Sequence, residues 1–131
     1  MNSKVKDKYN SYPSNVKKFA LQIRKIILEV AKDTDIDFIG EDLKWGEPSF
    51  LTKKSGSTFR LDWKKKTPEH LSLFFNCRTK LISTFKEMYP EDFEYVGNRE
   101  FRLPINQKFS ITKFKKCIEI AFKYNLLKKD L

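Results

Sequence analysis

The segment at 44–50, which reads KWGEPSF, constrains the fold most strongly, because Gly46 and Pro48 exclude a regular helix there. A short strand is therefore predicted at 49–52, and a hairpin turn separates it from the next predicted strand at 58–64. This second segment alternates apolar and polar residues, which is typical of a strand with one buried face. Its apolar side chains are those of Phe59, Leu61 and Trp63.

Helices and further strands are predicted on both sides of this hairpin. Apolar residues recur at three- and four-residue steps in the predicted helices, which cover 15–32, 79–88 and 111–128. The remaining strands are predicted at 70–76, 94–96 and 100–103. The element order is then α-β-β-β-α-β-β-α. Because hairpins join the strands, the sequence predicts an α+β fold, with a curved antiparallel sheet of about five strands and helices packed on one face.

The length of 131 residues and the hydrophobic content of 40% fit one domain with its own core. Residues 1–11 are charged and lack apolar periodicity, so they predict a flexible N-terminal arm before a single domain at 12–131. No apolar run approaches the roughly 18 residues that a membrane span needs, and the N-terminus lacks an apolar signal core. A cytoplasmic protein without membrane contact is expected, with Cys77 and Cys117 as reduced thiols.

Acidic residues gather in one segment of a chain whose formal net charge is +10. The candidate metal ligands in this segment are Asp33, Asp35, Asp37, Glu41 and Asp42. Hard cations prefer several carboxylate oxygens, which a loop can supply. An EF-hand is excluded, because Phe38 and Lys44 occupy the positions where that motif needs glycine and glutamate. The alternative interpretation is a solvated acidic loop that offsets the basic helices.

Four aromatic residues converge on two neighbouring predicted strands: Trp45, Phe50, Phe59 and Trp63. One interpretation places them in the core beneath the helices at 15–32 and 111–128. The other is a ligand cleft lined by the two tryptophans, because small-molecule sites combine apolar walls with a few polar groups. Arg60 or Lys44 would then orient an anionic group of a small molecule or a protein segment.

A nucleic acid or another polyanion is the alternative partner, because one predicted sheet face carries Arg60, Phe74 and Lys64. The lysines that flank this face are Lys53, Lys54, Lys65 and Lys66. An exposed Phe74 would also allow a homodimer in place of a monomer. His70 is the only histidine, and the sequence contains no P-loop, GxGxxG, GxSxG or HExxH motif. No catalytic residues, and therefore no enzymatic activity, are expected.

The segment at 44–50, preceded by a helix that carries Arg24 and Ile27, resembles the YdhG-like family of domains of unknown function. The resemblance covers roughly residues 12–128 and continues to a Lys-rich terminal helix. It carries no catalytic residues with it. Some members of the family are described as frataxin-like iron chaperones, so the resemblance implies iron handling as an alternative function; no other cofactor is expected. Frataxins present an acidic helical ridge to iron, whereas the helix at 15–32 is basic here.

Overall fold

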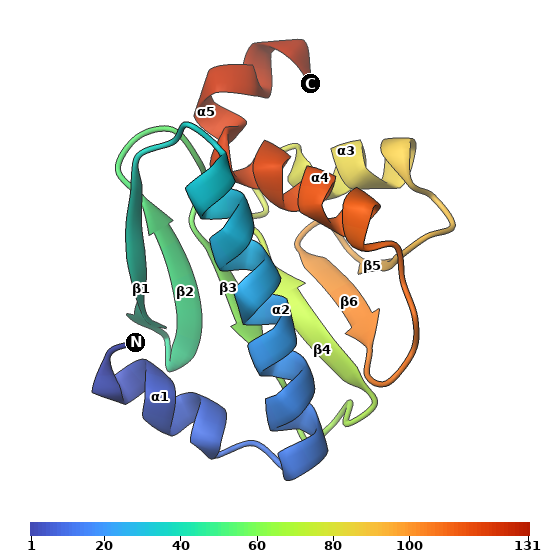
Figure 1. Cartoon of the computed structure of the whole chain (residues 1–131). Helices are drawn as coiled ribbons and strands as arrows, with labels where there is room; N and C mark the ends of the chain where they lie inside the picture. Colours follow the sequence, from blue (N-terminus) through green and yellow to red (C-terminus); the bar gives the residue numbers. More distant parts are fainter.

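Six antiparallel strands form one sheet in the order β1-β2-β3-β4-β6-β5, as a computed structural model of residues 1–131 shows (Figure 1). The strands are β1 (Phe38–Lys44), β2 (Glu47–Thr52), β3 (Phe59–Asp62), β4 (His70–Phe74), β5 (Glu94–Val96) and β6 (Glu100–Pro104). The helices are α1 (Ser3–Asn10), α2 (Ser14–Asp33), α3 (Leu81–Met88), α4 (Ile111–Phe122) and α5 (Tyr124–Leu127), and the short 3-10 helix η1 (Lys128–Asp130) follows them. The predicted α+β class and antiparallel arrangement are confirmed. None of the helices is long and apolar enough to cross a membrane.

The long helices α2 and α4 lie across one face of the sheet (Figure 1). The side chains that β3, β4 and β6 direct toward them are fully buried: Phe59, Leu61, Leu71, Leu73, Phe101 and Leu103. Alternation along each strand places these residues on the same face. They belong to one core of 29 buried residues, in which many contacts are between phenylalanines. Phe59, for example, lies 5.3 Å from Phe50 and 5.2 Å from Phe122 between ring centroids.

The sheet has six strands rather than about five, because β1 occupies a segment that was expected to be an acidic loop. Glu41 lies opposite Phe50 in the register of β1 and β2, so its side chain points toward the helices. The Arg24 guanidinium of α2 donates to both carboxylate oxygens of Glu41, at 2.8 and 3.0 Å from Nε. The charge of Arg24 therefore offsets that of Glu41 at a buried strand position. The acidic residues of the segment do not reveal this strand, because the partner of Glu41 belongs to a different element.

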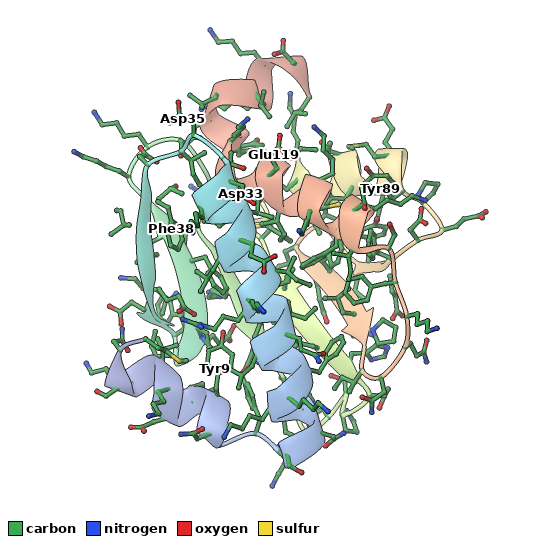
Figure 2. All side chains as sticks on the ribbon, in the orientation of Figure 1. Tyr9, Asp33, Asp35, Phe38, Tyr89 and Glu119 are labelled. Atoms are coloured by element: carbon green, nitrogen blue, oxygen red, sulfur yellow. The ribbon has the colours of Figure 1, made fainter.

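Residues 3–10, where a flexible arm was expected, form helix α1. Val5 and Tyr9 are buried on its inner side, and Figure 2 shows Tyr9 on the side of α1 that faces α2 and the sheet. The Asn2 side chain caps α1 by accepting from the Val5 N–H at 2.9 Å, and its amide donates to the Glu41 carbonyl of β1 at 3.3 Å. Only two apolar residues anchor this helix, which is too few for a periodic sequence signal.

The loop between β2 and β3 forms hydrogen bonds with the segment that follows α2 and with the last turn of α4. The Asp37 carboxylate accepts from the backbone N–H groups of Lys54 and Ser55, at 2.7 and 3.1 Å. The Ser57 N–H donates to the Ala121 carbonyl of α4 at 3.1 Å. Gly56 lies so close to the end of α4 that a Cβ atom there would stand 2.7 Å from the Ala121 carbonyl oxygen and nearer still to that of Phe122.

We expect Gly56→Ala to lower the free energy of unfolding by about 2–3 kcal/mol, because the added methyl group must push the loop away from backbone atoms of α4. Urea denaturation followed by circular dichroism measures this change. The matched control is Gly97→Ala, where φ is +60° but no heavy atom lies within 4 Å. That variant should lose only about 1 kcal/mol from backbone strain. Equal losses in the two variants would contradict the close packing of the loop on α4.

Candidate functional site

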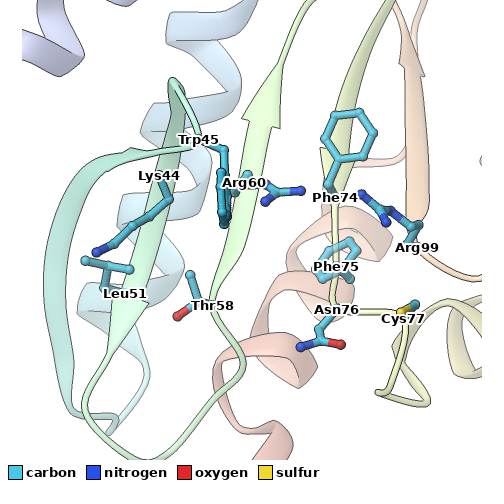
Figure 3. Close-up of a pocket in the computed structure, with 10 residues that line it drawn as sticks. All are labelled: Lys44, Trp45, Leu51, Thr58, Arg60, Phe74, Phe75, Asn76, Cys77 and Arg99. Atoms are coloured by element: carbon cyan, nitrogen blue, oxygen red, sulfur yellow. The ribbon is translucent and has the colours of Figure 1, made fainter.

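The face of the sheet turned away from α2 and α4 carries the alternate side chains of the central strands, and Figure 3 views the sheet from this side. Arg60 of β3 and Phe74 of β4 are direct partners in the strand register and point to this face. Their neighbours Leu61 and Leu73 are fully buried on the opposite side. The two outward residues form the centre of a surface hollow.

This hollow is a groove of about 350 Å³ between the β1–β2 turn and the end of β4 (Figure 3). The groove residues are Lys44, Trp45, Leu51, Thr58, Arg60, Phe74, Phe75, Asn76, Cys77 and Arg99. Three of them are cationic and none is acidic. The groove therefore combines aromatic surface with three cationic side chains, of which Arg60 alone has a carboxylate partner.

Trp45 projects from a two-residue turn that is closed by the pair Lys44 and Glu47. Both central residues have positive φ, +56° at Trp45 and +74° at Gly46, as in a type I′ turn. Glycine and asparagine adopt such angles readily, whereas a bulky aromatic residue does so at a cost. The Trp45 side chain gains little packing in return, because the residue is 89% exposed. The turn thus presents an indole ring to solvent at the edge of the groove.

Arg60 is held by Glu47 of the neighbouring strand, with 3.3 Å between Arg60 Nε and Glu47 Oε1. The arginine side chain is 23% exposed and that of the glutamate 14%. Burial raises the pKa of Glu47, and the nearby Asp62 raises it further, while the Arg60 charge acts in the opposite direction. The anchoring contact involves Nε, and Figure 3 shows the guanidinium pointing across the groove toward Phe74.

Phe74 is half-buried and forms the apolar floor of the groove, with Arg60 as its register partner on β3 and Glu100, itself paired with Arg102, as its register partner on β6. Lys64 Nζ lies 5.7 Å from the centre of the ring. Arg99 precedes β6, where its carbonyl accepts from the Phe75 N–H at 2.7 Å, and Figure 3 shows its side chain approaching Phe74 from the side opposite Arg60. Arg99 and Lys44 are exposed, and the 13 ion pairs of the structure, all with N···O distances up to 4.0 Å, include neither residue.

The predicted ligand residues separate into two groups. Lys44, Trp45 and Arg60 line the groove. Phe50 and Phe59 are fully buried on the helix side, in accordance with the core interpretation. Trp63 also belongs to the helix side: its ring lies 6.1 Å from that of Tyr12, and its Nε1 donates to the Pro68 carbonyl at 2.9 Å. The two tryptophans therefore do not line a common cleft.

Several groove residues were absent from the predicted set: Leu51, Thr58, Phe75, Asn76, Cys77 and Arg99. Phe74 was placed on this face by alternation, but it was not assigned to the cleft. Arg99 reaches the groove only because β4 pairs with β6 rather than with β5. Strand order of this kind has no local sequence signal.

The five carboxylates predicted as metal ligands are not brought together. Asp37 binds backbone N–H groups of the loop after β2, Glu41 binds Arg24, and Asp42 accepts from the Leu43 N–H at 2.8 Å. Asp33 and Asp35 lie at the end of α2 and in the loop that follows it (Figure 2). No group of three or more His, Cys, Asp or Glu side chains in the structure is arranged to hold a metal ion.

The two cysteines are free and differ in exposure. Cys77 is exposed in the groove, whereas Cys117 is buried in α4, where desolvation raises the pKa of its thiol to about 12. His70 lies outside the groove, with its Nε2 3.1 Å from a carboxylate oxygen of Glu94. Cys77 and His70 therefore do not form a nucleophile and base pair.

No protein-family model matches the chain, and no curated protein matches it either. One solved structure does: YdhG, a protein of the DUF1801 family from Bacillus subtilis. The match covers 98% of this chain and 94% of that chain, with a TM-score of 0.65 and 16% sequence identity. At this identity the likeness is one of fold, and it supports the resemblance of the 44–50 segment to the YdhG-like domains. The chain has the α+β fold of YdhG, a member of a family of unknown function.

Proposed function

We propose that this domain binds a small anionic ligand in the groove of the open sheet face, and that it does so without catalysing a reaction. The observation that supports this most directly is the charge of the groove, whose lining includes Lys44, Arg60 and Arg99 but no carboxylate. A concave surface lined by one sign of charge concentrates ligands of the opposite sign. Its volume of about 350 Å³ lies in the range of small-molecule sites.

The three cationic residues of the groove differ in whether they already have a carboxylate partner. Arg99 and Lys44 have no carboxylate partner, so an incoming anion breaks no ion pair there. Arg60 is engaged with Glu47 through Nε, which leaves the terminal nitrogens of its guanidinium for a ligand. Because a guanidinium can bind an oxyanion through two parallel hydrogen bonds, the arginines supply direction as well as charge.

The composition of the groove favours binding over catalysis. Cys77 and Thr58 carry the thiol and hydroxyl groups of the lining, and general-base activation of either would need a neighbouring group that accepts a proton. The lining contains no histidine, aspartate or glutamate that would fill that role. Iron handling, the alternative implied by the family resemblance, needs clustered oxygen or nitrogen ligands, and the groove offers cations instead.

A thermal-shift screen of anionic metabolites should identify compounds that raise the melting temperature, because a ligand that binds only the folded state stabilises it by mass action. Arg99→Ala should weaken binding of these compounds about tenfold, equivalent to about 1.4 kcal/mol. Lys66→Ala is the matched control, because Lys66 is exposed and lies outside the groove. Equal shifts in wild type and Arg99→Ala, or a screen in which only neutral compounds act, would contradict anion binding at this groove.

Replacement of Trp45 should change the free energy of unfolding and the affinity for the ligand in opposite directions. We expect Trp45→Asn to raise the free energy of unfolding by about 1 kcal/mol, because asparagine accepts positive φ more readily and almost no packing is lost. The same variant should lose affinity for those compounds of the screen that carry an aromatic ring. Trp45→Phe keeps both the ring and the strain, so its stability should match the wild type. Urea denaturation measures both variants, and a destabilised Trp45→Asn protein would show that the indole has a structural role.

A further inference from the structure

We infer that the ligand is a planar aromatic ring joined to a phosphate, as in a nucleoside monophosphate. The ring would stack on Trp45, and the phosphate would lie between Arg60 and Arg99 above Phe74. This inference rests on the proposed function, because it specifies which anions the groove selects. It goes further in assigning separate parts of the ligand to separate residues of the groove.

The ring is inferred from the way in which the turn presents Trp45. The residue is the most exposed large hydrophobic residue of the chain, at 89%, and its backbone has an angle that bulky residues rarely adopt. Figure 3 shows the indole edge-on beside Arg60, so that the ring stands upright on the sheet face. An upright, open indole offers a stacking surface to a flat heteroaromatic ring, and such stacking contributes about 1–3 kcal/mol per base.

The phosphate is inferred from the two arginines on either side of Phe74. Arg60 is on β3 and Arg99 directly precedes β6, and both strands are neighbours of β4. Strands that flank a common neighbour are about 10 Å apart, a distance that two long side chains can span from both sides. A phosphate monoester carries a charge of about −1.5 to −2, which suits two guanidinium groups better than one.

The groove favours a single ring over an extended nucleic-acid strand. Proteins that bind single strands present successive aromatic platforms along a basic track. Of the three aromatic residues in this groove, Phe75 is 3% exposed and Phe74 is half-buried among cations, so Trp45 alone presents an open ring. A hollow of about 350 Å³ also holds a mononucleotide more readily than a polymer.

The test uses a Trp63→Phe protein, in which Trp45 is the only fluorescent indole. It is titrated with the nucleotides AMP, GMP, CMP and UMP, with ribose 5-phosphate as the phosphate part, and with adenosine as the ring part. At least one nucleotide should quench Trp45 and bind at least about tenfold more tightly than either part alone. Trp63→Phe leaves the groove lining unchanged, because Trp63 lies on the helix side and outside the groove, and phenylalanine keeps an aromatic ring beside Tyr12.

Two substitutions in the otherwise wild-type chain assign the parts of the ligand to residues. Protection of Cys77 from iodoacetamide reports occupancy without fluorescence, because Cys77 is exposed in the groove and Cys117 is buried. Trp45→Asn should reduce nucleotide affinity to that of ribose 5-phosphate and leave ribose 5-phosphate itself unchanged. Arg99→Gln should reduce nucleotide affinity to that of adenosine. Lys66→Gln should change neither the affinity for the nucleotide nor the affinity for ribose 5-phosphate.

The outcomes separate this inference from the proposed function. If ribose 5-phosphate binds as tightly as every nucleotide, and Trp45→Asn leaves nucleotide affinity unchanged, then the aromatic part is wrong although anion binding stands. If no anion of the metabolite screen binds, the proposed function fails as well. If an oligonucleotide of about 12 residues binds more than about tenfold tighter than any mononucleotide, with strong salt dependence, the partner is a nucleic-acid strand and the inference is overturned.

Discussion

Burial of alternate side chains beneath α2 and α4 is the constraint on which the rest of the molecule depends. β3, β4 and β6 supply leucine and phenylalanine at every second position, and the helices cover them to form one core. Because side chains of a strand alternate between faces, the residues between them must lie on the other side of the sheet. Arg60 and Phe74 are exposed to the groove for this reason, and the hydrogen-bonded pairing of β3 with β4 places them side by side.

Polar contacts between distant segments determine where the β1–β2 hairpin lies beside these strands. The Arg24 and Glu41 pair joins α2 to β1, and the Tyr12 hydroxyl donates to the buried Asp62 carboxylate at 2.6 Å. A buried ion pair adds little net stability, but loss of one partner leaves an unpaired buried charge. Such contacts therefore specify one arrangement of the elements. The position of Trp45 relative to Arg60 depends in addition on the pairing of β2 with β3, in which Ser49 lies opposite Arg60.

Sequence patterns predicted those parts of the fold that depend on local periodicity. The alternation at 58–64 correctly placed Phe59 and Leu61 inside, and the alternation at 70–76 placed Phe74 on the outer face. The alternation at 58–64 also places Trp63 on the helix side, together with Phe59 and Leu61. The predicted cleft between Trp63 and Trp45 was therefore inconsistent with that alternation. β1 was missed because Glu41 is neutralised by a residue 17 positions away. Arg99 was missed because its place depends on strand order.

The edges of the sheet have a consequence for contacts between molecules. An exposed edge strand offers free N–H and C=O groups to which a strand of another chain can add, and this is a common route to aggregation. One edge here, β5, has only three residues, and the other, β1, contains an irregularity between Phe38 and Gly40. The Asn2 amide also occupies the Glu41 carbonyl of β1. The N-terminal segment thus covers part of the β1 edge, and a chain that lacks it would leave more of that edge open to a strand of another molecule.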